Sequence, residues 1–136
     1  MDLNMKLILS ALLMMIVTIL PGCGGTPSDR PNLAPVQGVV TLDGNPVEGA
    51  IVTFLPEKGR PSSGVSGKDG HYQLNYIREI MGAALGHHQV QITTVDRSEG
   101  AAPFKELFPA KYNSKTELTA DVVSGKNTIN FDLESK

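Results

Sequence analysis

The chain has 136 residues, and its formal net charge at pH 7 is −2. Charged residues make up 19% of the sequence and aromatic residues 5%, with no tryptophan. A nucleic-acid-binding domain normally carries a clustered basic surface, so this balance argues against nucleic acid as a partner. The single cysteine excludes an intramolecular disulfide, and the length suits one domain of ordinary size.

The N-terminal segment has the parts of a secretory signal peptide. Lys6 precedes an uncharged apolar run over residues 7–20, and Pro21, Gly22 and Cys23 follow it. A positive start, a short apolar stretch and a small residue at the exit are typical of an export signal. The run is 14 residues long, whereas a helix that crosses the hydrocarbon core needs about 20. We therefore predict a signal helix over residues 1–22 that is removed, and not a permanent transmembrane helix.

Cys23 is the candidate site of lipid attachment. Residues 20–23 resemble the lipobox of bacterial lipoproteins, with Leu20 at the apolar position, Gly22 at the small one and Cys23 at the lipidated one. The resemblance implies cleavage between Gly22 and Cys23 and acylation of Cys23 with chains such as palmitate. Pro21 departs from the Ala or Ser that is more usual there. Since one acyl chain binds a membrane only marginally, a triacylated Cys23 would supply a stable anchor. The alternative is a plain signal peptide with an unmodified Cys23.

Residues 23–35 form the second predicted segment, the lipidated cysteine and a tether. Residues 24–35 are rich in Gly, Pro and Ser and show no apolar periodicity. Such a composition predicts a flexible, partly extended chain that holds the following domain away from the bilayer.

Residues 36–136 are predicted to form one β-sandwich domain, because short apolar alternations of period two recur between turn signals. We expect strands near residues 36–42, 50–55, 65–66, 72–76 and 88–94, with turns at 43–46 and 67–70 and a loop at 56–64. Residues 78–86 could form one helical turn, and residues 96–116 are irregular, with Phe104, Leu107 and Phe108 tucked into the domain edge. Residues 118–122 and 129–133 are predicted to pair as a hairpin.

Three stretches of this domain resemble the carboxypeptidase regulatory-like family. Residues 38–54, beginning Gly-Val-Val-Thr-Leu-Asp-Gly-Asn-Pro-Val-Glu-Gly-Ala, match the family's G-x-V-x-x-x-G-x-P-[LV]-x-G-A-x-V opening. Residues 68–74 are similar to its D-x-x-G-x-[FY]-x-[FL] hairpin without the first Asp, and residues 85–92 to its P-G-x-Y-x-V-x-[VI] strand, with Leu85 and His88 replacing Pro and the aromatic residue. The resemblance implies an all-β, seven-stranded transthyretin-like (Ig-like) sandwich over about residues 36–134.

The candidate reactive side chains do not suggest a catalytic or metal site. Neighbouring residues of a strand point to opposite faces, so His87 and His88 cannot easily share an ion, and a catalytic zinc usually needs three protein ligands. We expect His88 to pack under a sheet edge and His71 and His87 to be solvated. Asp43 begins a turn rather than a calcium loop, since the later ligands are missing. Other polar groups interpreted as ordinary loop or surface residues are Ser62, Ser63, Ser66, Lys105, Lys111 and Lys115.

The sequence therefore predicts a non-enzymatic, membrane-anchored envelope lipoprotein whose sandwich serves binding, assembly or structure, without a cofactor. An exposed edge strand is the expected docking surface for an envelope protein partner. Gly24 follows Cys23 at the position where Asp would, by family analogy, favour retention at the inner membrane. We therefore expect the protein at the outer membrane, facing the periplasm. One alternative is a carbohydrate- or small-ligand-binding module, with an exposed Tyr76 or Tyr112 beside a cleft. A transthyretin-like hydrolase is a third, disfavoured because residues 131–136 lack that family's Tyr-Arg-Gly-Ser ending.

Overall fold

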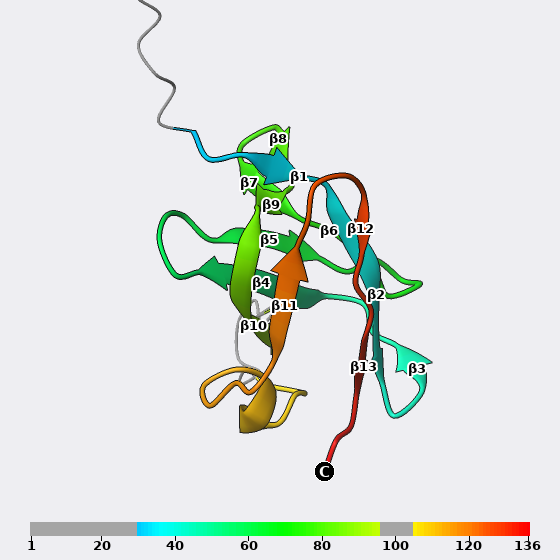
Figure 1. Ribbon diagram of the computed structural model, residues 1–136. Helices are drawn as coiled ribbons and strands as arrows, with labels where there is room; N and C mark the ends of the chain where they lie inside the picture. Colours follow the sequence, from blue (N-terminus) through cyan, green and yellow to red (C-terminus); the bar gives the residue numbers. More distant parts are fainter. Residues whose placement is uncertain (1–29, 96–104) are drawn as a thin grey trace, which may run out of the picture. The chain divides into compact units, whose positions relative to one another are not determined.

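Alternating burial along short strands defines the domain in a computed structural model that describes residues 30–95 and 105–136 (Figure 1). Residues 31–136 form one unit that is almost entirely β-structure. The predicted all-β sandwich is confirmed. The signal segment, Cys23 and residues 24–29 of the predicted tether lie outside the described residues.

The larger sheet has six strands in the order β11-β10-β4-β5-β7-β8. Their bounds are β4 Ala50–Pro56, β5 Ser62–Val65, β7 Asn75–Ile77, β8 Ile80–Met81, β10 Gly86–Thr94 and β11 Thr119–Val122. All neighbours are antiparallel, and β10 pairs with β4 along seven residue pairs from His88↔Pro56 to Thr94↔Ala50. The predicted inward faces are confirmed here, because alternate residues of β4 and β10 are buried.

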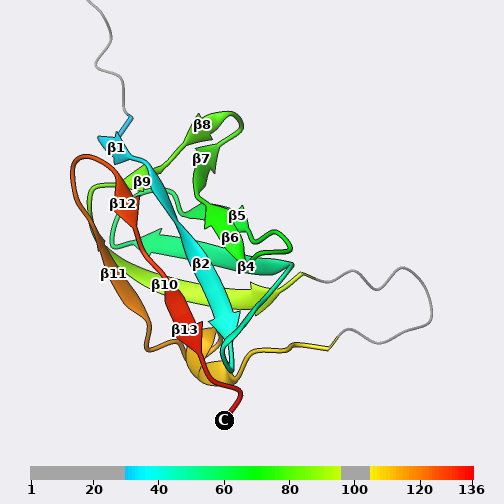
Figure 2. The same ribbon diagram turned by 90° about the vertical axis from the view of Figure 1, so that its right-hand side faces the viewer.

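The smaller sheet is built around β2. Its strands are β2 Val36–Leu42, β3 Asn45–Pro46, β6 His71–Gln73, β12 Asn127–Thr128 and β13 Phe131–Leu133. Antiparallel β3 and β6 lie on one side of β2, and β12 and β13 pair with its other side in parallel. A short pair of β1 Leu33–Ala34 and β9 Ala83–Ala84 lies beyond its end. Figure 2 shows β2 and β13 crossing over β4 and β10, which form the opposite layer.

Four details of the sequence prediction are corrected by the structure. Residues 118–133 do not form a hairpin, because β11 pairs with β10 in the larger sheet while β12 and β13 pair with β2 in the smaller one. Residues 78–86 contain no helical turn but the short strands β8 and β9. The strand expected at 65–66 occupies Ser62–Val65, within the predicted loop. Leu107 is 48% exposed, whereas Phe108 is buried as predicted, and Phe104 lies outside the described residues.

The core between the two layers is aliphatic with a central group of aromatic rings. Phe54 of β4 makes an edge contact with Phe131 of β13, with ring centroids 6.2 Å apart. Tyr72 of β6 lies 6.1 Å from the same Phe131 ring. Aromatic pairs at these separations stabilise a core beyond their buried area. The rings are surrounded by buried aliphatic side chains: Val36, Val40, Val52, Leu74, Val90, Ile92, Val122 and Leu133.

Gly38 leaves room for the Tyr72 side chain to cross β2 and to join β6 to the segment between β12 and β13. It lies opposite Tyr72 in the pairing of β2 with β6. The Tyr72 hydroxyl donates a hydrogen bond to the carbonyl of Ile129, on the other side of β2. A Cβ at position 38 would lie 1.8 Å from that carbonyl oxygen and 3.0 Å from the Tyr72 ring. Burial raises the pKa of Tyr72, so the hydroxyl remains protonated and available as a donor.

We predict that Gly38→Ala destabilises the domain by about 3 kcal/mol, because the new methyl group overlaps a backbone oxygen that two strands hold in place. Chemical denaturation of the full chain followed by circular dichroism measures the change. Gly67→Ala is the matched control, since a Cβ there meets no atom closer than 3.5 Å. Equal unfolding midpoints for the two variants would contradict this account of Gly38.

A milder effect is expected for Tyr72→Phe, which keeps the ring and removes the hydroxyl. The Ile129 carbonyl then loses its side-chain donor in a partly buried place, and a loss of about 1–2 kcal/mol follows. The same denaturation experiment measures it. A change within error would mean that the ring alone joins the strands.

The C-terminal tail is held by Asp43, in the two-residue turn between β2 and β3. Asp43 and Gly44 have φ values of 51° and 82°, the combination that an Asp-Gly hairpin turn adopts. The Asp43 carboxylate accepts a hydrogen bond of 3.0 Å from the Ser135 amide. Hydrogen bonds from the side chain and the backbone of Ser135 lower the pKa of Asp43 below its ordinary value of 3.8.

The tail contact should therefore depend on pH. A carboxyl group whose pKa is lower in the folded state stabilises that state above its ordinary pKa of 3.8, and the contribution disappears as the pH falls through the lowered value. We expect the Ser135 amide resonance to move toward its position in Asp43→Asn when the pH is lowered from 6 to 2, as measured by NMR titration. A Ser135 amide that does not respond to acid would refute the contact.

Candidate functional site

The predicted lipidation site, Cys23, and the cleavage position, Gly22, lie outside the described residues. Over residues 30–95 and 105–136, no helix is both long enough and apolar enough to cross a membrane. Within the described residues, the features that could form a site are the histidines, the tyrosines and the hollows of the sandwich.

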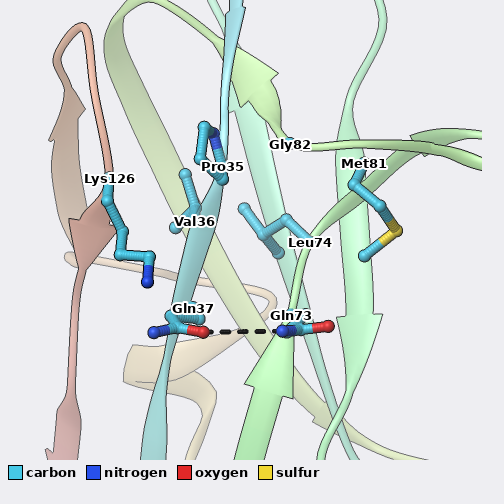
Figure 3. Close-up of a pocket in the computed structure, with 8 residues that line it drawn as sticks. All are labelled: Pro35, Val36, Gln37, Gln73, Leu74, Met81, Gly82 and Lys126. Atoms are coloured by element: carbon cyan, nitrogen blue, oxygen red, sulfur yellow. Dashed lines mark hydrogen bonds between the residues drawn. The ribbon is translucent and has the colours of Figure 1, made fainter.

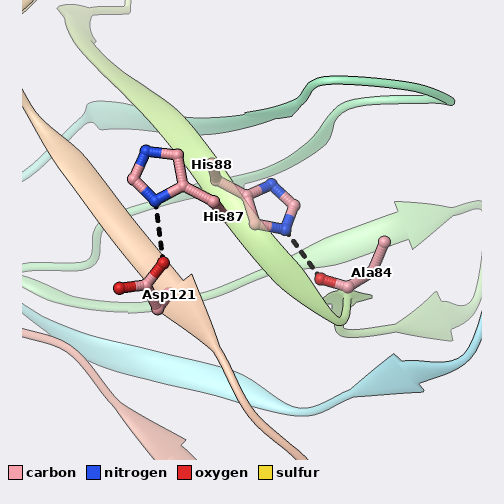
Figure 4. A network of polar contacts seen from close by, with 4 residues as sticks. All are labelled: Ala84, His87, His88 and Asp121. Carbon is pink, nitrogen blue, oxygen red and sulfur yellow. Dashed lines mark hydrogen bonds and ion pairs between the residues drawn. The ribbon is translucent and has the colours of Figure 1, made fainter.

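His88 is a core residue, as predicted. It is 1% exposed and lies against Phe54, with ring centroids 5.5 Å apart. Its Nε2 donates a hydrogen bond of 2.7 Å to the carbonyl of Ala84 (Figure 4). Its Nδ1 and the Ser62 hydroxyl have no hydrogen-bond partner among the described residues. Since a carbonyl oxygen can only accept, Nε2 carries a proton, and the ring serves the packing of the sheet.

His87 lies on the outer face of the same strand. Its Nδ1 donates to the Asp121 carboxylate on β11 at 2.7 Å, across the register pair His87↔Asp121 (Figure 4). Both side chains are more than half exposed. Exposed pairs of this kind contribute little to stability. Since a carboxylate can only accept, this hydrogen bond places a proton on Nδ1 of His87.

The three histidines do not converge. His71 is exposed on β6 of the smaller sheet, while His87 and His88 point to opposite faces of β10 in the larger one. In the described part of the chain, no group of three or more His, Cys, Asp or Glu side chains is placed to hold a metal ion. The predicted placement of all three histidines is confirmed.

The tyrosines offer little stacking surface. Tyr72 and Tyr112 are buried, and Tyr76 is half-buried. The Tyr112 hydroxyl accepts a hydrogen bond from the Glu134 amide, and the Lys111 ammonium lies 5.0 Å from the centre of its ring. Tyr112 thus supports the C-terminal tail rather than an open cleft.

The prediction that Ser62 and Ser66 are loop or surface residues is wrong, because both are buried, at 1% and 3% exposed. Ser66 accepts a hydrogen bond from the Ala50 amide and donates one to the carbonyl of Val47, which closes the entry into β4. Ser62 is buried opposite Phe54 in the pairing of β5 with β4. Among the described residues, neither serine forms a hydrogen bond with a histidine.

One hollow of about 110 Å³ lies where β2, β6 and β8 meet (Figure 3). We call it the β2–β8 bowl. Its floor is buried and apolar, and its rim carries amide, thioether and ammonium groups. The residues that line it are Pro35, Val36, Gln37, Gln73, Leu74, Met81, Gly82 and Lys126.

A second, wider hollow of about 430 Å³ lies beside His87 at the end of β4. Glu57 and Lys58 line it with Pro56 and Leu85. Its polar side chains are exposed and point into open solvent. It is therefore a less enclosed feature than the β2–β8 bowl.

The sequence prediction missed the β2–β8 bowl. Its lining residues come from four separated segments, and only the pairing of β2 with β6 brings Gln37 opposite Gln73. Met81 lies in the segment interpreted as a helical turn, and Lys126 in a turn interpreted as part of a hairpin. To find the site from the sequence, one would have had to assign β12 to the parallel side of β2.

Comparison with known proteins finds a distant similarity of fold. No protein-family model matches the chain, and no curated protein does. The fold is similar to the crystal structure of a DUF3823 family protein from Parabacteroides merdae ATCC 43184, with a TM-score of 0.44 and 17% sequence identity. The similarity covers 76% of this chain and 46% of that one, so the chain spans about half the length of its structural neighbour.

Proposed function

We propose that the protein is a lipid-anchored, non-enzymatic lipoprotein of the cell envelope, whose β-sandwich serves as a binding, assembly or structural module. The observation that carries the proposal is the run of residues 7–23, in which Gly22 and Cys23 follow a short apolar segment. Its apolar part is shorter than a spanning helix requires, and its end resembles a lipobox. Two or more acyl chains on Cys23 would make attachment stable.

The distance between the anchor and the domain supports a role close to the membrane surface. The first strand, β1, begins at Leu33. Residues 24–32 can span at most about 30 Å when fully extended. The sandwich would then work within about one domain diameter of the lipid headgroups, facing the periplasm if Gly24 directs sorting to the outer membrane.

The ends of the larger sheet support a role in binding. Strands β11 and β8 are its outermost members, so one side of each has no strand neighbour among residues 30–95 and 105–136. An extended segment of an envelope protein can add to such an edge through backbone hydrogen bonds. A hydrolase of the transthyretin-like kind is less well supported, because the histidines lie on different faces and sheets.

A small-ligand-binding module is the second candidate, and the β2–β8 bowl favours it. The bowl is concave, has an apolar floor and carries several polar groups on its rim. Those are the usual properties of a small-molecule site. A carbohydrate ligand is less well supported, since two of the three tyrosines that could stack on a sugar are buried.

The anchor is tested by intact-mass measurement of protein extracted from membranes. We expect the mature chain to begin at residue 23 and to carry the mass of the attached acyl groups. Cys23→Ala should lack the mass of the acyl groups and, once residues 1–22 are removed, should lose membrane association, because its thiol is the only one in the chain. Ser28→Ala is the matched control and should stay membrane-bound.

A mature protein recovered with an unmodified thiol at residue 23 would overturn the anchoring proposal. Circular dichroism of Cys23→Ala checks that the sandwich still folds. A loss of β-structure in that variant would make the fractionation result uninformative about lipid, and the intact mass of the unaltered chain then decides.

A further inference from the structure

The β2–β8 bowl has the size of one small ring. Its volume is about 110 Å³, of the same order as the roughly 150 Å³ apolar cavity that accommodates benzene in an engineered protein. Val36 and Leu74 form its floor and are 2% and 0% exposed. The apolar surface that a ring can reach belongs to Pro35 and Met81, which line the bowl and are exposed, so a ring held between them would remove that surface from water and favour binding.

The walls of the bowl are held in place by the fold. The Gly82 amide donates a hydrogen bond of 2.8 Å to the carbonyl of Leu74. A Cβ on Gly82 would lie 2.5 Å from the carbonyl oxygen of Ala34, so only glycine lets the chain approach β1 so closely. This contact fixes the backbone next to Met81, whose side chain lies at the rim and is 47% exposed. A thioether in that place is a favourable partner for an aromatic ring.

The polar groups of the bowl include two donors on one side. The Gln73 amide donates to the Oε1 of Gln37 at 3.4 Å. This orientation turns the amide nitrogen of Gln37 toward the side where Lys126 lies (Figure 3). The Lys126 ammonium makes no hydrogen bond or ion pair with any described residue, and no acidic side chain lines the bowl. The site therefore lacks the negative charge that would complement this cation.

We propose that the β2–β8 bowl binds a carboxylate joined to a single ring-sized apolar group, as in a small aromatic acid. The ring lies between Pro35 and Met81, above the buried Val36 and Leu74, and the carboxylate accepts hydrogen bonds from Lys126 and the Gln37 amide. Hydrogen bonds between charged partners are the stronger kind and give the site its preference for an acid. This assignment deepens the proposed function and rests on its binding role.

The same chemistry occurs in a free aromatic acid and in the C-terminal phenylalanine of a peptide. Two probes distinguish these sources: phenylacetate, and a tetrapeptide that ends in a free phenylalanine carboxylate. Tighter binding of the tetrapeptide would assign the bowl to a peptide end, and equal or weaker binding to a free acid.

Met81 provides a specific reporter for the experiment. Of the five methionines, Met81 alone lies outside residues 1–22. The full chain, carrying methionine labelled with ¹³C at its methyl group and kept in a detergent without carboxylates, is titrated with phenylacetate. We expect a saturable shift of the Met81 methyl resonance, assigned with Met81→Leu, with a dissociation constant on the order of millimolar for so small a ligand.

Charge selectivity separates this proposal from general apolar binding. Lys126→Gln should weaken phenylacetate binding about tenfold and leave binding of the neutral phenylacetamide unchanged. Lys115→Gln is the matched control, since Lys115 is an exposed lysine that does not line the bowl. Acetate, which lacks the ring, should not shift Met81 at the same concentration.

The proposal is overturned if the Met81 methyl does not respond to either acid, or if phenylacetate and phenylacetamide bind equally to the unaltered chain and to Lys126→Gln. Such a result leaves the lipid anchor untouched, because the anchor is decided by the mass at residue 23. Conversely, a chain that carries no lipid but still binds phenylacetate would support this site and contradict the proposed membrane anchor.

Discussion

A buried phenol hydroxyl and the absence of a side chain at one glycine hold the smaller sheet together. Tyr72 on β6 and Ile129 beyond β12 lie on opposite sides of β2, and their hydrogen bond passes over Gly38. The Tyr72 ring then contacts Phe131, which contacts Phe54 in the opposite layer. One row of aromatic rings thus connects the sheets, and it exists only because β2 presents no Cβ at that place.

Local patterns of the sequence were sufficient for the strands and their faces. Val36, Val40, Val52 and Val90 are buried while their neighbours along the strands are more exposed, because a half-buried strand must alternate. The partners of the strands were less accessible. Residues 118–133 have the spacing of a hairpin, yet the turn after β11 carries the chain into the other layer. Asn127 stabilises this crossing, with its side-chain amide donating to the carbonyls of Val123, Gly125 and Pro35.

The candidate site was predictable in part. Adjacent strand positions point to opposite faces, and this rule alone separated buried His88 from exposed His87. The β2–β8 bowl could not be found in the same way. A bowl depends on which strands are neighbours and on how closely Gly82 approaches Ala34, and neither is encoded by the period of the apolar residues. Its residues form no recognisable motif in the sequence, because the fold brings them together from separate segments.

The parallel pairing of β13 with β2 has a consequence for biogenesis. Phe131 pairs with Val40, so about ninety residues separate two strands that must lie side by side. A sheet closed by contacts so distant in sequence forms slowly. While residues 131–133 are still being synthesised, the side of β2 that pairs with β13 stays uncovered. The smaller sheet therefore closes only after nearly all of the described domain has left the ribosome.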